Sequence, residues 1–373
     1  MSKKNILIID DSALMRRVIS DIIEADQRFK VIGAAINGLA GLSMLQENYG
    51  KVDAVLLDIN MPRMNGLEVL EKIKNQNIKT TVIVVSAVTT KDAVETIRAL
   101  ELGAFDFITK PESFEDLRSN AFADRLIGCL AVATIPKLTE PQIVISTEPP
   151  KIIATSLQKE AHDEVLPPIH KKPQVAGQKI KNKLVALACS TGGPKALHSI
   201  LPYLPKDIDA GVVIVQHMPE GFTKSLADRL NSLCQVQVKE AEDGDVLIKG
   251  CVYIAKGGRQ LRITKDEKGN HVLRVSREAP RNGLLPCADI LYESLIDTDY
   301  DEITCVVLTG MGSDGSTGIS ELSKNKNIHV IAQDRKTSIV YGMPRSIRMT
   351  GLVDKVVSLN EVSEAIIENV GVH

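Results

Sequence analysis

The sequence predicts two α/β domains, each built on a parallel sheet. Short apolar runs such as "NILIID" alternate with helix-length amphipathic segments, first over residues 5–120 and again from residue 183 onward. Strands separated by helices favour right-handed crossovers and a parallel sheet. A proline-rich stretch lies between the two alternating regions, and a chain of 373 residues is too long for one ordinary core.

The first alternating region contains five apolar runs that we expect to be strands. They lie at residues 5–10, 31–36, 53–59, 81–87 and 105–109. Between them, "GLEVLEKIKNQ" and "DAVETIRALEL" have the apolar spacing of amphipathic helices. We place this domain at residues 1–122.

The next segment has no sustained period. Seven of the 16 prolines fall between residues 132 and 180, and proline interrupts both helices and central strands. We interpret residues 123–180 as a flexible, partly extended linker.

The second domain is expected at residues 181–373. Its apolar runs lie at residues 183–189, 210–217, 303–309 and 327–333, which predicts a doubly wound parallel sheet. Residues 250–276 interrupt this pattern and resemble β-hairpins, with "EKGN" as one turn. We therefore expect a β-hairpin insertion in this domain.

The composition argues against several classes of protein. The net charge is −2, with 45 Lys plus Arg against 47 Asp plus Glu, which does not favour nucleic-acid binding. The first apolar run, residues 6–9, stops at Asp10 after four residues, too soon for a signal peptide or a membrane span. The six cysteines form no C-x-x-C pair, so a zinc site is not expected. We expect a cytoplasmic protein without membrane insertion.

Polar side chains follow successive strands of the first domain: Asp10, Asp11, Asp58, Ser86 and Lys110. The carboxyl ends of parallel strands meet at one edge, where α/β sheets bind ligands. Three carboxylates gathered there favour a cation such as Mg²⁺. The lysine and the hydroxyl could then contact a phosphoryl group.

With "DINMPRMNG" and "TKP" around these residues, the first domain resembles the response-regulator receiver family, a flavodoxin-like fold. The resemblance implies that Asp58 accepts a phosphoryl group and that Asp11, Asp58 and the Asn60 carbonyl bind Mg²⁺, assisted by Asp10. It also implies that Ser86 and Phe107 are the switch hydroxyl and the switch aromatic, with Lys110 beside them.

The second domain contains two glycine loops. The loop "GMGSDG" has Gly310, Gly312 and Gly315 in the G-x-G-x-x-G spacing of dinucleotide-binding loops, with Asp334 near the end of the next strand. A nucleotide-binding output domain is therefore an alternative. Asp314 within the loop argues against it, because its charge would oppose a pyrophosphate.

The other loop is "CSTGGP", and it allows a different site. Ser190, His217 and Asp314 follow three strands, and in a parallel sheet they would share one edge. That set could form a nucleophile, a general base and an orienting acid. Each could instead be a helix cap or a satisfied polar residue, and Cys189 could be the nucleophile in place of Ser190.

Longer motifs favour the hydrolase among these alternatives. "ACSTGGPKAL", "VVIVQHMPEGFTKSLADRLN", "VYIAKGG" and "VVLTGMGSDG" resemble the chemotaxis receptor methylesterases of the CheB family over about residues 183–370. The resemblance implies that Ser190, His217 and Asp314 are catalytic, with Thr191 beside them and the Met311 amide in the oxyanion hole.

Three positions depart from that family's usual pattern. Cys189 replaces a small residue before the nucleophile, and Arg335 stands where an acidic residue is common. "LLPCAD" at residues 284–289 replaces "HRPSVD", so a polar His-Arg pair that could contact substrate is missing.

The resemblance implies a phosphorylation-regulated serine hydrolase that removes methyl esters from glutamates of chemoreceptors and releases methanol. It extends to deamidation of receptor glutamines. Its partners would be methyl-accepting chemoreceptors and a chemotaxis histidine kinase. Mg²⁺ would serve the receiver only, and ester hydrolysis would need no cofactor. A catalytically inert response-regulator adaptor is the other alternative.

Overall fold

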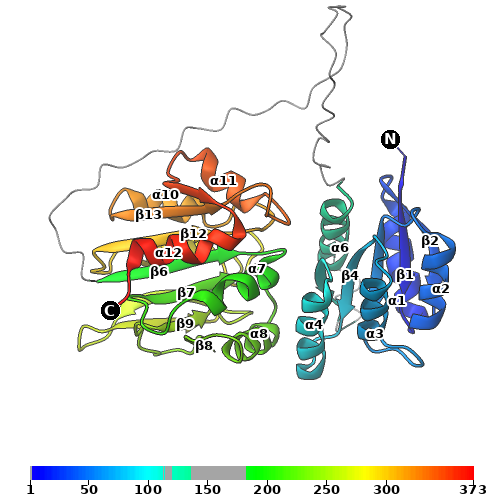
Figure 1. Cartoon of the computed structure of the whole chain (residues 1–373), viewed down its shortest axis with the longest axis horizontal. Helices are drawn as coiled ribbons and strands as arrows, with labels where there is room; N and C mark the ends of the chain where they lie inside the picture. The colour runs from blue at the N-terminus through cyan, green and yellow to red at the C-terminus, as the bar shows by residue number, and fades with distance from the viewer. Residues whose placement is uncertain (1, 112, 114–119, 136–181) are drawn as a thin grey trace, which may run out of the picture.

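The computed structural model describes residues 2–111, 113, 120–135 and 182–373. These residues form two α/β units (Figure 1). Residues 136–180 of the expected linker lie outside the described residues. None of the helices in the described ranges combines the length and apolar character that a bilayer crossing requires.

The N-terminal unit is a five-stranded parallel sheet in the order β2-β1-β3-β4-β5. Its elements are β1 Lys4–Ile9, α1 Ala13–Ala25, β2 Phe29–Ala35, α2 Gly38–Glu47, β3 Ala54–Asp58, α3 Gly66–Asn75, β4 Thr81–Ser86, α4 Thr90–Leu102, β5 Asp106–Thr109 and α6 Asn120–Ala133. All five residues of β3 are buried, as expected for a central strand covered on both faces. The five strands expected from the sequence are therefore confirmed, with ends that differ by one or two residues.

Helix α6 moves the end of this unit past residue 122. Phe122, Leu126 and Leu130 of α6 are buried in one core cluster with residues of β1, β3 and β4. Their spacing of four residues places them on one face of the helix. The expected linker start at residue 123 therefore lies inside a helix that completes the sandwich.

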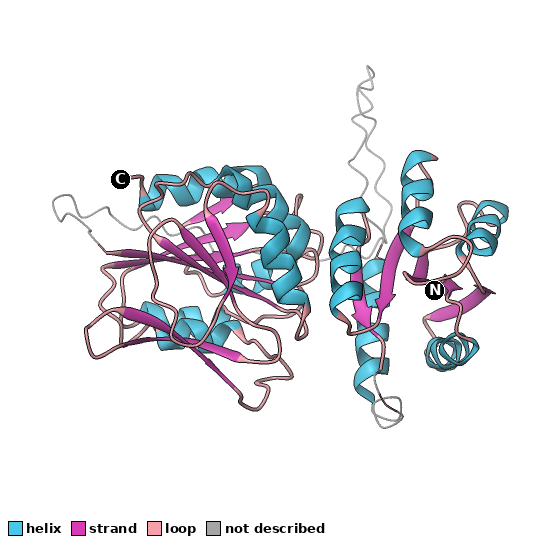
Figure 2. Ribbon diagram, turned by 90° about the horizontal axis from the view of Figure 1, so that it is seen from below, coloured by secondary structure: helices cyan, strands magenta, loops and turns pink. Residues whose placement is uncertain are grey.

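The C-terminal unit is a seven-stranded sheet in the order β14-β13-β12-β6-β7-β9-β8, and all its pairings are parallel. Its strands are β6 Lys183–Cys189, β7 Gly211–Gln216, β8 Gln237–Glu240, β9 Cys251–Ile254, β12 Glu302–Val307, β13 Ile328–Gln333 and β14 Lys355–Val357. Its helices are α7 Gly193–Ile200, η1 Leu201–Tyr203, α8 Phe222–Asn231, α9 Ala288–Ser294, α10 Ser316–Ser323, α11 Met343–Met349, η2 Leu359–Glu361 and α12 Val362–Val370. Figure 2 shows helices on both faces of this sheet.

The hairpin insertion is smaller than expected. β10 Gln260–Lys265 and β11 His271–Ser276 form one antiparallel hairpin, and its turn includes the predicted "EKGN". β9 does not belong to a hairpin, because it pairs in parallel with β7 and β8. Its four residues are all buried, so it behaves as a strand of the main sheet.

The chain order reverses at the centre of the larger sheet. From β6 the chain runs outward to β7 on one side, whereas β12 pairs with β6 on the other side. Loops that follow β6, β7 and β12 therefore meet at one edge, at a topological switch point where α/β sheets bind ligands.

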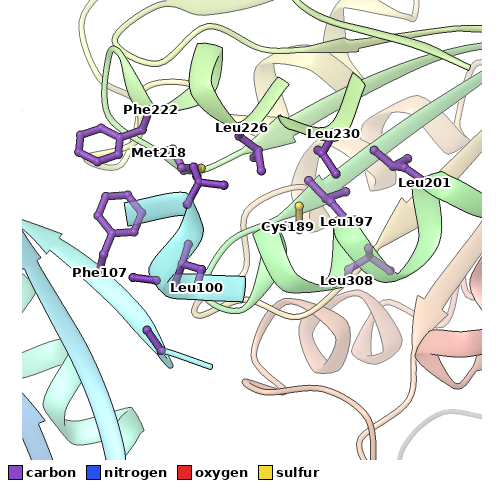
Figure 3. Packing of buried hydrophobic residues seen from close by; sticks show 14 of the residues in the cluster. Leu100, Phe107, Cys189, Leu197, Leu201, Met218, Phe222, Leu226, Leu230 and Leu308 are labelled. Carbon is purple, nitrogen blue, oxygen red and sulfur yellow. The ribbon is translucent and has the colours of Figure 1, made fainter. Parts of the chain in front are cut away.

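The two units pack against each other through apolar side chains. Phe107 of β5 stacks on Phe222 of α8, with ring centroids 4.7 Å apart. Figure 3 shows this pair beside Leu100 of α4 and Met218. One core cluster includes residues of both units, so the contact is a packed apolar interface.

Candidate active site

The loop after β6 exposes Ser190 without using it as a helix cap. Gly192 has a φ of 78° and occupies the N-cap position of α7, where no side chain caps the helix. Glycine tolerates this left-handed conformation at no steric cost. The alternative that Ser190 and Thr191 only cap a helix is therefore wrong. Ser190 is instead part-exposed at the strand end.

His217 and Asp314 meet at the same edge of the sheet. His217 follows β7, and its Nε2 lies 2.7 Å from Oδ2 of Asp314. Nδ1 is then the ring nitrogen left for another partner. Because β12, β6 and β7 are neighbouring parallel strands, the sheet brings Ser190 to this edge as well. The three residues expected to act as nucleophile, base and acid therefore lie at one edge of the sheet, and their catalytic roles stay a prediction.

Asp314 is held as an ionised acceptor. Its carboxylate accepts from the amides of Ala288, Asp289 and Gly315 at 2.6 to 3.0 Å and from the Cys287 thiol at 3.1 Å. Burial would raise the pKa of Asp314, but the His217 hydrogen bond and charge, with these amides, lower it to about 2. A carboxylate fixed this way can orient the His217 ring and stabilise its protonated form.

Cys189 does not share the exposed position of Ser190. Its side chain is fully buried, and its Sγ donates to Oε1 of Gln216 at 3.1 Å. Burial raises the pKa of the Cys189 thiol far above its usual range. The thiolate needed for attack is therefore disfavoured, and Cys189 is a poor candidate for the nucleophile.

The second glycine loop packs against the first. A Cβ on Gly310 would lie 2.3 Å from Sδ of Met343 and 2.9 Å from Cβ of Ser190. Glycine is thus needed here for the approach of protein atoms. The amides of Gly315 and Gly318 at the start of α10 already donate to Oδ1 of Asp289 at 2.9 and 2.7 Å. These contacts oppose a pyrophosphate site.

A cavity of about 970 Å³ lies over this edge. Ser190, Thr191, His217, Met311 and Asp314 line it, as do residues of the N-terminal unit. Among the latter, Asp106 of β5 accepts a hydrogen bond from the Thr191 side chain. Burial raises the pKa of Asp106, and the bond from Thr191 opposes that shift. Met311 is 52% exposed, and the role of its amide stays a prediction.

Ion pairs also connect the two units, near the stack of Phe107 on Phe222. Oε1 of Glu101 on α4 lies 2.6 Å from Nε of Arg229 and 3.0 Å from Nε2 of His198. Met311 also approaches α6, since a Cβ on Gly128 would lie 3.7 Å from its Cε. The N-terminal unit therefore contacts the C-terminal unit beside the aromatic stack and again at Met311, which lines the cavity.

The acidic edge of the N-terminal unit is organised around one lysine. Nζ of Lys110 lies 2.9 Å from Oδ2 of Asp10 and 2.9 Å from Oδ2 of Asp58. Burial raises the pKa of Asp58 to about 6, although the Lys110 charge opposes the shift. One cation thus faces two buried carboxylates.

The same edge fits a divalent cation. Carboxylate oxygens of Asp10, Asp11 and Asp58 lie within 4.8 Å of one another. Hard oxygen ligands with excess negative charge suit Mg²⁺. The Asn60 side chain donates to Asp92, and the expected role of its backbone carbonyl stays a prediction.

The two expected switch residues lie in different surroundings. Ser86 is buried, and its hydroxyl accepts from Oγ1 of Thr96 at 2.8 Å. Phe107 is directed to the other unit, where it stacks on Phe222. The side chain expected to respond to phosphorylation is thus also an interface residue.

Several residues of the site were not singled out from the sequence. Asp289 holds the loop of Asp314, and Gln216 contacts the loops of Ser190 and His217. Asp106 and Glu101 contact the other unit. Asp289 is the acidic residue that "LLPCAD" retains from the family pattern, which was a usable signal. Leu284 and Leu285, in place of the polar pair, line the cavity.

Comparisons with known proteins agree with both halves of the chain. The CheB methylesterase family model matches residues 185–366, and the response regulator receiver domain model matches residues 6–122. A protein-glutamate methylesterase/protein-glutamine glutaminase 1 of Syntrophomonas wolfei is 38% identical over 371 residues, covering 98% of this chain and 99% of its own. A protein-glutamate methylesterase/protein-glutamine glutaminase of Bacillus subtilis is 38% identical over 363 residues, 97% of each chain. One from Pyrococcus horikoshii is 38% identical over 99% of this chain and 94% of its own.

Proposed function

Because the chain belongs to the CheB methylesterase family and begins with a receiver domain, we propose that it hydrolyses methyl esters of glutamate side chains on chemoreceptors. The observation that carries this proposal is the convergence of Ser190, His217 and Asp314 at one sheet edge, with a 2.7 Å contact between the last two. The reaction converts the ester and water into a glutamate carboxylate and methanol.

His217 takes the proton from the Ser190 hydroxyl as its oxygen attacks the ester carbonyl. The tetrahedral intermediate collapses, and His217 gives that proton to the departing methoxide, which leaves as methanol. Water then attacks the acyl-enzyme, again losing a proton to His217, and Ser190 is regenerated. Asp314 keeps the imidazole oriented and stabilises its charge throughout.

The oxyanion needs donors that are in place before the reaction. We assign this role to the Met311 amide, with Thr191 beside the nucleophile. A glutamine side chain presents the same acyl group with ammonia as the leaving group. We therefore extend the proposal to deamidation of receptor glutamines.

The receiver acts as the regulatory input in this proposal. Asp58 accepts a phosphoryl group from a chemotaxis histidine kinase, and Asp10, Asp11 and Asp58 with the Asn60 carbonyl would hold Mg²⁺. When bound, that ion neutralises charge on the transferring phosphoryl group. Lys110 and Ser86 would contact the phosphoryl oxygens. These events belong in the cytoplasm, where we place the protein.

Unphosphorylated receiver would restrict access to the active site. The shared cavity and the contact between Asp106 and Thr191 support this. Phosphorylation would draw Ser86 and Phe107 inward and remove the ring that stacks on Phe222. Moving a closed population of about 99% to mostly open requires several kcal/mol in favour of the open state.

The test compares methanol release from a methylated receptor by residues 181–373, by the full chain and by Asp58→Ala, each with and without acetyl phosphate and Mg²⁺. We expect a constitutively active fragment, an activated full chain and a low, unresponsive variant. Equal rates for the fragment and the unphosphorylated chain would contradict the restriction of access. No methanol from any form would leave the adaptor alternative.

A further inference from the structure

A buried glutamine joins the backbones of the proposed nucleophile and base. Gln216 is the last residue of β7 and is 1% exposed. Its Nε2 donates to the carbonyl of Ser190 at 3.1 Å and to the carbonyl of His217 at 3.2 Å. One amide nitrogen therefore uses both hydrogens to hold together the peptide units that carry these two side chains.

The orientation of this amide is fixed. Oε1 of Gln216 accepts from the Cys189 thiol at 3.1 Å, and the two residues are register partners at the ends of β7 and β6. Turning the amide over would place Oε1 against two carbonyl oxygens, which can only accept. The two carbonyls and the thiol thus select one arrangement.

The surrounding chain leaves room for the amide. A Cβ on Gly193 would lie 2.0 Å from Oε1 of Gln216 and 3.0 Å from Sγ of Cys189. The Gly193 amide also donates to the Ser190 carbonyl at 2.7 Å. The start of α7 is therefore fitted around the side chain that bonds the Ser190 loop.

Gln333 provides a contrast within the same sheet. It is also fully buried at the end of a strand, β13, and its side chain bonds the Thr309 amide at 2.8 Å and the Thr337 hydroxyl at 3.3 Å. Its partner Thr309 accepts from the Ser190 amide at 3.0 Å, but the Gln333 side chain itself bonds neither the Ser190 carbonyl nor the His217 carbonyl. Gln216 differs because its two acceptors belong to residues whose reacting atoms must stay aligned.

We propose that Gln216 is a positioning residue of the hydrolase, setting the separation of Ser190 and His217 through their carbonyls, and that the Cys189 thiol holds its amide in place. This inference rests on the function proposed above. It predicts that loss of the amide impairs the chemical step and leaves receptor binding intact.

Gln216→Met tests the role in the full, phosphorylated chain, because methionine has similar length and no donor. Two readouts are the kcat and KM of methanol release and the rate at which a fluorophosphonate probe labels Ser190. A displacement of about 1 Å at such a site costs about 10²-fold. We expect kcat and labelling to fall by about that factor while KM changes less than about threefold.

Gln333→Met is the matched control, since it removes a buried strand-end amide that bonds neither carbonyl. We expect its kcat to stay within about threefold of wild type. An equal loss of kcat in both variants would reduce the effect to general loss of a buried amide and overturn the inference.

The Cys189 pair covers the case in which Gln216→Met does not fold. Cys189→Ser keeps a donor to Oε1 and should retain wild-type labelling, whereas Cys189→Ala should label several-fold more slowly. In that case, equal labelling rates for wild type and both Cys189 variants would overturn the inference.

The labelling of Ser190 also separates this inference from the proposed function. If wild type and Gln216→Met are labelled at the same rate, this inference alone is overturned. An unlabelled wild-type Ser190 overturns it together with the proposed function.

Discussion

Asp314 and Asp58 both lie at the carboxyl-terminal edge of a parallel sheet, but their surroundings shift their pKa values in opposite directions. Asp314 accepts hydrogen bonds from three amides and a thiol besides His217. Asp58 shares one lysine with Asp10 in a buried pocket. The pKa of Asp314 falls to about 2, whereas that of Asp58 rises to about 6.

The two pKa shifts show which carboxylate is already stabilised by protein groups and which is not. The hydrolase site satisfies the charge of Asp314 with fixed protein groups, so this carboxylate is oriented without an added cation. The receiver site holds more negative charge than its lysine balances, so a cation or a phosphoryl group can change its state. Five predictions arise from this comparison.

The largest effect is expected at the nucleophile. Ser190→Ala removes one oxygen from a part-exposed residue, so the fold and Asp58 phosphorylation should persist while kcat for methanol release falls about a millionfold. Cys189→Ala is the control and should lose less than about tenfold. An active Ser190→Ala beside a dead Cys189→Ala would reverse the assignment, and a merely tenfold loss in Ser190→Ala would contradict covalent catalysis.

Asp314→Asn should come next, with kcat reduced about 10⁴-fold, because the amide cannot keep the His217 tautomer or stabilise its charge. Asp334→Asn is matched, since Asp334 also follows a strand of this sheet but bonds Thr337 locally. Its kcat should stay near wild type. An equal loss of kcat in Asp314→Asn and Asp334→Asn would contradict a specific role of Asp314 in catalysis.

Asp58→Asn should stabilise the protein at pH 8. A raised pKa means that the folded state binds more protons than the unfolded state between about pH 4 and 6, so stability falls as pH rises through that window. Removing the charge should recover about 1–3 kcal/mol at pH 8 and little at pH 4. Urea unfolding of the receiver transition at both pH values measures this. A destabilised variant at pH 8 would mean that the Lys110 ion pair outweighs burial.

Because the pKa of Asp314 is lowered, ionisation of this carboxyl stabilises the folded state, the opposite of the effect at Asp58. Its contribution to stability is present above about pH 4 and is lost as pH falls toward 2. In urea unfolding that follows the hydrolase transition, Asp314→Asn should therefore lower stability at pH 8. If Asp58→Asn and Asp314→Asn changed the free energy of unfolding at pH 8 in the same direction, the contrast between the two sites would be wrong.

The smallest effect is expected at the interface between the two units. Phe107→Ala removes the ring stacked on Phe222, and we expect basal methanol release without phosphodonor to rise up to about tenfold, since such aromatic pairs contribute about 0.5–1.5 kcal/mol. Glu101→Gln breaks exposed ion pairs and should change it less than about threefold. Unchanged basal activity in Phe107→Ala would show that the stack does not limit access.

The strands of the first sheet, four strands of the second and the shared edge of Ser190, His217 and Asp314 could be predicted, because short buried runs and parallel order determine which loops share an edge. The short strands β8 and β14 were not expected. β9 was misjudged as part of a hairpin, since a four-residue apolar run does not reveal its partner. Helix α6 was assigned to the linker from residue 123 onward, although Phe122, Leu126 and Leu130 repeat every four residues. Gln216 and Asp106 were missed because their roles depend on contacts with residues far along the chain.

The stack of Phe107 on Phe222 also has a thermodynamic consequence for the proposed switch. If phosphorylation and interdomain packing compete for one ring, each must weaken the other by the same factor, since linkage is reciprocal. Packing of the hydrolase domain on the receiver would then disfavour phosphorylation of Asp58, just as phosphorylation of Asp58 disfavours that packing. A receptor that holds the hydrolase domain away from the receiver would favour the phosphorylated state, so substrate engagement and the activating signal would reinforce each other.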